Sequence, residues 1–196
     1  IVNTNIVELT FSEDVTASIA NNAANYTLSN GIVVLSAVAQ SNVVVLTLNA
    51  DLVQGTTYTL TIAQQTDCLG NAASNLTTQI AIPLPAAPGD VVINEIFADP
   101  DPVVGLPIYE FIELYNTRNF PINLNDWHIS NSYPDLDGTI NNATIPANGY
   151  LVLCATGAAL TAYQGIAGIN VTGVTSFPSI LNTNGTLTLV DPNGTV

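Results

Sequence analysis

Lysine and methionine are absent from this sequence of 196 residues, and Arg118 and His128 are its only basic side chains. Charged residues make up 8% of the chain, and the excess of acidic ones gives a formal net charge of −14. Nucleic acids and anionic membrane surfaces attract cationic proteins and repel a chain of this charge. The composition therefore excludes a nucleic-acid partner for this region. It leaves two interpretations of the acidity, a solvated surface or cation binding.

Long apolar runs are also missing. No stretch approaches the roughly 18 apolar residues that a membrane-spanning helix requires, so no membrane insertion is predicted. The chain does not open with a Met, a basic segment or a cleavage site typical of a secretory signal. Because strand-like sequence runs up to both ends, we interpret the chain as a piece of a larger protein.

Cysteine is scarce. Cys68 and Cys154 are the only two, and they lie far apart in the sequence. We expect free, mostly buried thiols, because a disulfide would have to join the two halves of the chain. With His128 as the only imidazole, a catalytic cysteine is not indicated.

Asn, Thr and Ser supply most of the polar residues, and hydrophobic residues make up 47% of the chain. Thr, Val and Ile suit the half-buried face of a strand. In the first eighty residues, short runs that alternate apolar and polar side chains are separated by turn residues. The runs that predict strands are 7–11, 26–28, 32–38, 43–48 and 58–62. With no amphipathic helical window between them, they predict a β-sandwich.

Prolines at positions 83, 85 and 88 predict an extended linker over residues 84–90, because proline interrupts a sheet ladder. We therefore predict one domain over 1–83 and another over 91–196. The second has its own core around Phe111 and Trp127 and one helical turn over 158–163. Its predicted strands are 91–97, 109–116, 122–124, 127–130, 150–154 and 185–190.

The second half resembles the lamin tail domain family. The resemblance rests on five motifs in family order: INEI at 93–96, EFIELYN at 110–116, LNDWHI at 124–129, IPANGYLVL at 145–153 and NGTLTLVDPNG at 184–194. The family fold is an immunoglobulin-like β-sandwich, and it usually continues past the last glycine into a further strand. The resemblance thus implies either that the last strand is missing from 91–196 or that the fold is completed differently.

The first half resembles the bacterial immunoglobulin-like module of surface-layer and other extracellular bacterial proteins. It shares VELTFSE at 7–13, YTL at 26–28, LTL at 46–48, GTTYTL at 55–60 and DCLGN at 67–71. The strand that normally opens this module would precede Ile1. Together the two resemblances imply an all-β chain of two tandem immunoglobulin-like β-sandwich domains.

Calcium is the cofactor that the acidic loops suggest, because calcium prefers six to eight oxygen ligands held on loops. Asp99 and Asp101 alternate with prolines, and Asp135 and Asp137 precede Gly138. We name these four aspartates as candidate calcium ligands. The alternative is that both segments are ordinary turns, since Asp, Pro and Gly are common turn formers.

Catalytic residues are not predicted. Neither a nucleophile elbow nor a zinc-binding helix motif occurs, and no Ser or Cys partner is indicated for His128. Glu95, Glu110 and Glu113 could in principle form a glycosidase-like pair of carboxylates. Because a sandwich strand offers no obvious cleft, we expect no enzyme.

Three functions remain open at this point. The first is a spacer or adhesion region of a secreted or cell-surface bacterial protein, whose partners are its other domains or a surface protein. The second is calcium-dependent binding of a glycan or surface polymer, for which Tyr109, Phe120 and Tyr133 are candidate stacking residues. The third is a set of accessory domains of a secreted hydrolase.

Overall fold

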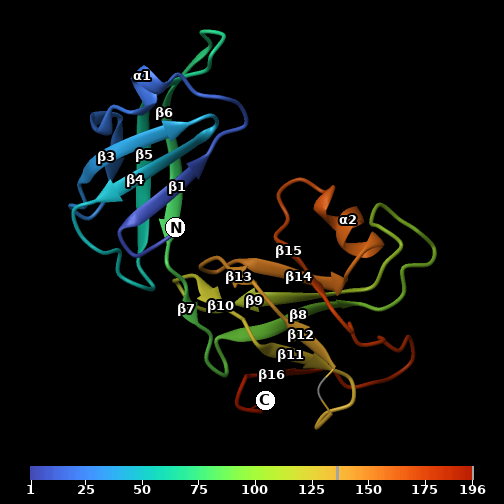
Figure 1. Cartoon of the computed structure of the whole chain (residues 1–196). Coiled ribbons are helices and arrows are strands. Elements are labelled where there is room, and N and C mark those ends of the chain that lie inside the picture. Colours follow the sequence, from blue (N-terminus) through green and yellow to red (C-terminus); the bar gives the residue numbers. More distant parts are fainter. Residues whose placement is uncertain (136, 196) are drawn as a thin grey trace. The chain divides into compact units, whose positions relative to one another are not determined.

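The computed structural model describes residues 1–135 and 137–195, and the chain divides into two compact units, Ile1–Ile82 and Pro83–Val196. Strands dominate both units (Figure 1). The prediction of an all-β chain is confirmed. No helix in the described ranges is long and apolar enough to cross a membrane.

The first unit consists of two three-stranded sheets, with the strand orders β1-β4-β3 and β2-β5-β6. All pairings within these sheets are antiparallel. The strands are β1 (Ile6–Thr10), β2 (Tyr26–Leu28), β3 (Val34–Gln40), β4 (Val43–Leu48), β5 (Thr57–Thr66) and β6 (Ala72–Ala81).

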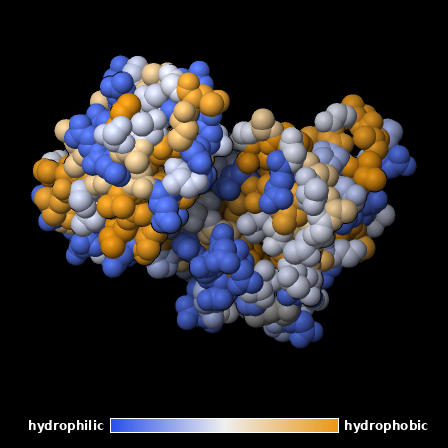
Figure 2. All heavy atoms as spheres, turned by 45° about the horizontal axis from the view of Figure 1, so that its top comes forward, coloured by the Kyte–Doolittle hydropathy of each residue, from blue (hydrophilic) through white to orange (hydrophobic). Residues whose placement is uncertain are grey.

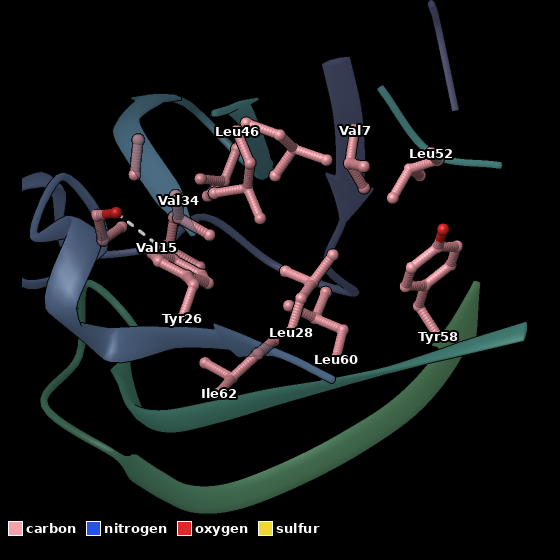
Figure 3. Packing of buried hydrophobic residues seen from close by; sticks show 14 residues of the cluster. Val7, Val15, Tyr26, Leu28, Val34, Leu46, Leu52, Tyr58, Leu60 and Ile62 are labelled. Atoms are coloured by element: carbon pink, nitrogen blue, oxygen red, sulfur yellow. Dashed lines mark hydrogen bonds between the residues drawn. The ribbon is translucent and has the colours of Figure 1, made fainter. Parts of the chain in front are cut away.

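The core of the first unit follows from alternation along the strands. In β4, Val44, Leu46 and Leu48 are buried and alternate with half-buried residues, as one face of a sheet requires. Figure 3 shows Leu46 of one sheet and Leu60 of the other among the side chains of this core. The Tyr58 hydroxyl lies at one end of the core and accepts a hydrogen bond from the Val53 main-chain nitrogen at 2.9 Å.

Three elements of the first unit escaped prediction. They are α1 (Ala17–Ala20), the 3-10 helix η1 (Ala23–Asn25) and β6. The helical turns are too short to produce an amphipathic pattern. In β6 the residues from Ala72 to Gln79 are exposed on both faces, so their side chains carry no alternation of apolar and polar positions.

The second unit contains a four-stranded sheet, β15-β14-β9-β8, and two three-stranded sheets, β12-β11-β16 and β13-β10-β7. Its one described helix is α2 (Ala158–Gln164), which confirms the predicted helical turn at 158–163. The strands are β7 (Leu84–Pro85), β8 (Val91–Phe97), β9 (Phe111–Asn116), β10 (Ile122–Asn123), β11 (Trp127–Ser130), β12 (Gly138–Ile140), β13 (Thr144–Ile145), β14 (Tyr150–Ala155), β15 (Val171–Val174) and β16 (Thr188–Val190).

Two clusters of buried side chains stabilise the second unit. The larger includes Trp127, Ile112 and Leu153. The smaller joins Phe111 and Cys154 to Tyr163 of α2. The Phe111 and Tyr163 rings meet edge to face with centroids 5.6 Å apart. Because β9 contributes to both clusters, this strand is packed on both of its faces.

The segment 84–90, predicted as a linker, lies within the second unit, and its first two residues form β7. The expectation that its prolines preclude a sheet ladder is wrong at this point. The Leu84 nitrogen donates to the Pro121 oxygen at 3.1 Å, and the Ala86 nitrogen donates to the Asn123 oxygen at 2.9 Å. Pro85, which has no N–H, lies between these donors on an edge strand, where proline is tolerated.

Candidate functional site

The loop between β8 and β9, residues 98–110, carries the first pair of candidate calcium ligands. The Asp99 carboxylate accepts a hydrogen bond from the Asp101 main-chain nitrogen at 3.2 Å. Both aspartates are exposed. The loop therefore holds these carboxylates on one local turn in contact with solvent.

The same loop continues into an apolar stretch. Val103, Val104, Leu106 and Ile108 are between 40% and 81% exposed, with Val104 the most exposed of them. No charged residue occurs between Pro102 and Ile108. Figure 2 shows apolar side chains on this end of the second unit, where Figure 1 places α2 and the β8–β9 loop.

The second candidate pair, Asp135 and Asp137, follows β11, and Leu136 between them lies outside the described residues. One carboxylate oxygen of Asp137 lies 3.1 Å from the Asn131 main-chain nitrogen and 3.0 Å from the Ser132 hydroxyl, and both donate to it. The Ser130 hydroxyl is 2.6 Å from the Asp135 carbonyl oxygen. The Asn131 N–H, followed by the hydroxyls of Ser132 and Ser130, lowers the pKa of Asp137. Asp137 is thus an ionised group that stabilises its own turn.

The four aspartates do not form a recognisable metal cluster. Across residues 1–135 and 137–195, no three His, Cys, Asp or Glu side chains are grouped so that they could hold a metal ion. Calcium binding at Asp99, Asp101, Asp135 and Asp137 stays a prediction.

A hollow of about 250 Å³ lies beside the end of β8. Its apolar lining comes from Ile96, Ala98, Ile180, Leu181 and Leu187. Among the residues that the structure describes, the rest of its lining is Asn131, Ser179, Gly185 and Thr186, none of which is charged. This surface, called the uncharged hollow below, has the mixed apolar and neutral polar character of a binding surface.

Ala98 also lines a second hollow. Ile108, Tyr109, Glu110 and Phe177 are among its lining residues. Tyr109 is held in place there, because the Tyr163 hydroxyl donates to its main-chain oxygen at 2.6 Å. Glu110 accepts a long hydrogen bond, 3.5 Å, from the Ile180 nitrogen.

The remaining glutamates lie on the sheet. Glu95 and Glu113 are directly opposite each other on β8 and β9, and the Asn94 side chain donates to Glu113 at 2.7 Å. Neither lines the two hollows just described.

The histidine contacts a neighbouring strand, and the two cysteines differ in their exposure. The His128 ring nitrogen Nδ1 lies 3.3 Å from the Thr139 hydroxyl on the neighbouring strand. Both cysteines are free. Cys154 is buried, and burial raises its pKa to about 11, which suppresses the reactive thiolate. Cys68 is exposed, so the expectation of two mostly buried thiols is wrong for this residue.

The candidate stacking residues differ in how freely they are presented. Tyr133 is exposed, and its hydroxyl donates to the Gly194 oxygen at 3.4 Å. The Arg118 guanidinium lies 5.6 Å from the Phe120 ring centroid, which covers part of that ring. Of the two hollows described above, Tyr109 lines the second, whereas Phe120 and Tyr133 line neither.

Asn116 is a structural residue that sequence reasoning missed. It is fully buried at the end of β9. Its side-chain nitrogen lies 2.9 Å, 3.2 Å and 2.8 Å from the carbonyl oxygens of Phe120, Ile145 and Pro146, and its oxygen accepts from the Arg118 nitrogen at 2.9 Å. A polar residue at an apolar strand position was the available signal, because buried amides are normally hydrogen-bonded.

Two known protein families match the chain, one in each half. A family model described as Lamin Tail Domain matches residues 85–196, and one described as Bacterial Ig-like domain matches residues 1–81. These are families of immunoglobulin-like structural domains, which confirms the predicted pair of tandem β-sandwiches. No curated protein matches the chain.

Among solved structures, part of the chain is similar to the N-terminal part of the bacterial S-layer protein SbsC. The sequence identity is 21%, the TM-score is 0.39, and the match covers 48% of this chain. The match spans 24% of the SbsC chain.

Proposed function

The chain belongs to the lamin tail domain family, and we propose that it is a non-catalytic spacer and interaction region of a larger bacterial protein exposed outside the cell. A bacterial immunoglobulin-like module precedes the lamin tail domain in this chain, and the family of this module consists of structural domains.

The main support for this proposal is that the polar side chains considered as site residues form hydrogen bonds that stabilise the fold. Asp137 stabilises its own turn, Asn116 cross-links loops, and Glu113 accepts from Asn94 within the sheet. In the described part of the chain, the uncharged hollow brings together no acid, base and nucleophile. The second unit exposes the apolar stretch 102–108 of the β8–β9 loop and the apolar and neutral polar lining of the uncharged hollow, which suit binding rather than chemistry.

The test is accessibility in the cell that makes the parent protein. Antibodies raised against this chain are applied to intact and to permeabilised cells, and the culture medium is assayed in parallel. We expect signal on intact cells or in the medium, and loss of the cell signal when intact cells are treated with protease. A signal that appears only after permeabilisation would contradict the proposed location.

A further inference from the structure

Asparagine followed directly by glycine is a reactive pair, and this chain contains four such pairs, at Asn30, Asn148, Asn184 and Asn193. The main-chain nitrogen of the glycine can attack the side-chain carbonyl carbon of the asparagine, because glycine has no Cβ atom to obstruct the approach. The attack requires that the glycine nitrogen is free and that the main chain can rotate between the two residues. The surroundings of each pair therefore decide how fast it reacts.

Two of the pairs are held by a hydrogen bond from the glycine nitrogen itself. The Gly149 nitrogen donates to the Pro146 oxygen at 3.0 Å, and the Gly194 nitrogen donates to the Asp191 oxygen at 3.0 Å. Each nitrogen must give up this bond before it can attack the preceding residue. The structure therefore protects the asparagines of both pairs.

The pair at Asn30 is held by the residues on either side of it. It lies in the turn between β2 and β3, where Asn30 and Gly31 have positive φ angles of 60° and 74°. The Ser29 nitrogen donates to the Thr59 oxygen at 3.0 Å, and the Ile32 nitrogen donates to the Ser29 oxygen at 3.4 Å. Rotation of the pair disturbs this turn, so its reaction is slowed as well.

The pair at Asn184 has neither restraint. Residues 181–186 are all exposed, and none of them makes a hydrogen bond with any other residue that the structure describes. The atoms nearest to a Cβ atom built on Gly185 are 3.8 Å away, and both belong to Leu181. A segment without such bonds reorients at little cost in free energy. The Gly185 nitrogen is thus free to approach the Asn184 side chain.

We propose that Asn184 is converted spontaneously to a mixture of aspartate and isoaspartate. The Gly185 nitrogen forms a bond to Cγ of Asn184, the Cγ–Nδ2 bond breaks, and ammonia leaves with the proton of the glycine N–H. A water molecule then opens the resulting cyclic imide at either of its carbonyl carbons. The reaction consumes water and releases ammonia, and no electrons are transferred.

The conversion changes the uncharged hollow. Gly185 and Thr186 line this hollow, so the new carboxylate is attached directly before two of its lining residues. Isoaspartate also lengthens the main chain by a methylene group at this point. The binding surface of the second unit therefore becomes more negative as the molecule ages. The conversion itself does not depend on the function proposed above.

Peptide mapping by mass spectrometry measures the conversion at each pair. The whole chain is incubated at mildly alkaline pH, once in its native state and once in denaturant, and the ratio of the two rates is determined for each asparagine. One hydrogen bond corresponds to a factor of up to about ten in rate, so we expect a ratio near unity at Asn184 and roughly one tenth at Asn148 and Asn193. A native rate at Asn184 no faster than at another pair, or a ratio as low as theirs, would overturn the proposal.

Gly185→Ala tests the attacking nitrogen. The added methyl group hinders the attack, and the structure has room for it. We expect conversion of Asn184 to fall about tenfold in this variant, as it does where the glycine nitrogen is protected. Thr186→Ala is the matched control, since it changes the same exposed loop, leaves the reactive pair intact and should react as the wild type does. An unchanged rate in Gly185→Ala, an equal loss in the control, or aspartate formed without isoaspartate would each overturn the cyclic-imide route.

Discussion

Cys68 and Cys154 differ in their exposure to solvent. Cys68 is exposed, whereas Cys154 is buried with its pKa raised to about 11. We expect one thiol per chain to react rapidly with a thiol reagent in the native protein and the second only after denaturation. Two rapidly reacting thiols would contradict the burial of Cys154, and none would contradict the free state of Cys68.

Asp67, Asp137 and Asp191 each close a turn as hydrogen-bond acceptors. The Asn71 side chain is the main cause of the lowered pKa of Asp67, and the Thr195 main-chain nitrogen is the main cause for Asp191. A folded-state pKa below the ordinary value of 3.8 stabilises the protein above that pH. This contribution is lost as the pH falls through the lowered pKa values.

Acid unfolding checks this linkage. Melting temperature should fall steeply as the pH drops below about 4, because protonation removes the charged acceptors. In Asp137→Asn the melting temperature should fall less steeply with pH, since one carboxylate whose pKa is lowered by folding is gone. Asp135→Asn, whose side chain is exposed, is the control and should keep the wild-type slope. Identical slopes in all three proteins would contradict the role assigned to Asp137.

At the scale of the elements, Asn116 joins the end of β9 to two loops. Asn116→Ala leaves buried carbonyl oxygens without their donor, so we expect a loss of about 1–3 kcal/mol in the free energy of unfolding. Chemical denaturation measures it. Asn182→Ala, at an exposed position, should change stability little. Equal effects of the two substitutions would contradict the cross-linking role.

Gly138 begins β12, where a side chain has no room. A Cβ atom there would lie 2.5 Å from Val174 Cγ1 and 3.2 Å from the Ser176 carbonyl oxygen. Gly138→Ala should therefore cost about 1–3 kcal/mol through overpacking. Gly185→Ala is the matched control, because its nearest neighbours are 3.8 Å away. A calorimetric melt in which both variants match the wild type would remove this packing argument.

Strands with clear alternation were predictable, and elements without it were not. The runs at 26–28, 43–48, 91–97 and 127–130 coincide with β2, β4, β8 and β11. The exposed side chains of β6 and the two-residue strand β13 carry too little pattern to be recognised. The role of Gly138 was also hidden, because a glycine after two aspartates is typical of a turn, whereas here it allows two segments to approach closely.

The candidate site was only partly predictable for a similar reason. The acidic loops were visible in the sequence, but the use of Asp137 by its own turn depends on donors from Asn131 and Ser132. The uncharged hollow combines β8 with residues 179–187, which are distant in sequence. Only the fold brings such segments together, so no local motif could indicate them.

At the scale of the whole molecule, each of the two units has a hydrophobic core of its own. The buried clusters that stabilise them draw on separate residues, from Val7 to Ile62 in one and from Val91 to Ile180 in the other. Each piece should therefore fold by itself. Trp127 is the only tryptophan and is 4% exposed, so its fluorescence reports the second unit alone.

The most direct test is to express residues 83–196 alone and to monitor the unfolding of this piece by its tryptophan fluorescence. We predict a blue-shifted emission from the buried Trp127 and a single cooperative transition, because the core around Trp127 lies wholly within this piece. An emission maximum typical of water-exposed tryptophan in the absence of denaturant, or a signal without a cooperative transition, would contradict the account of a self-sufficient structural domain.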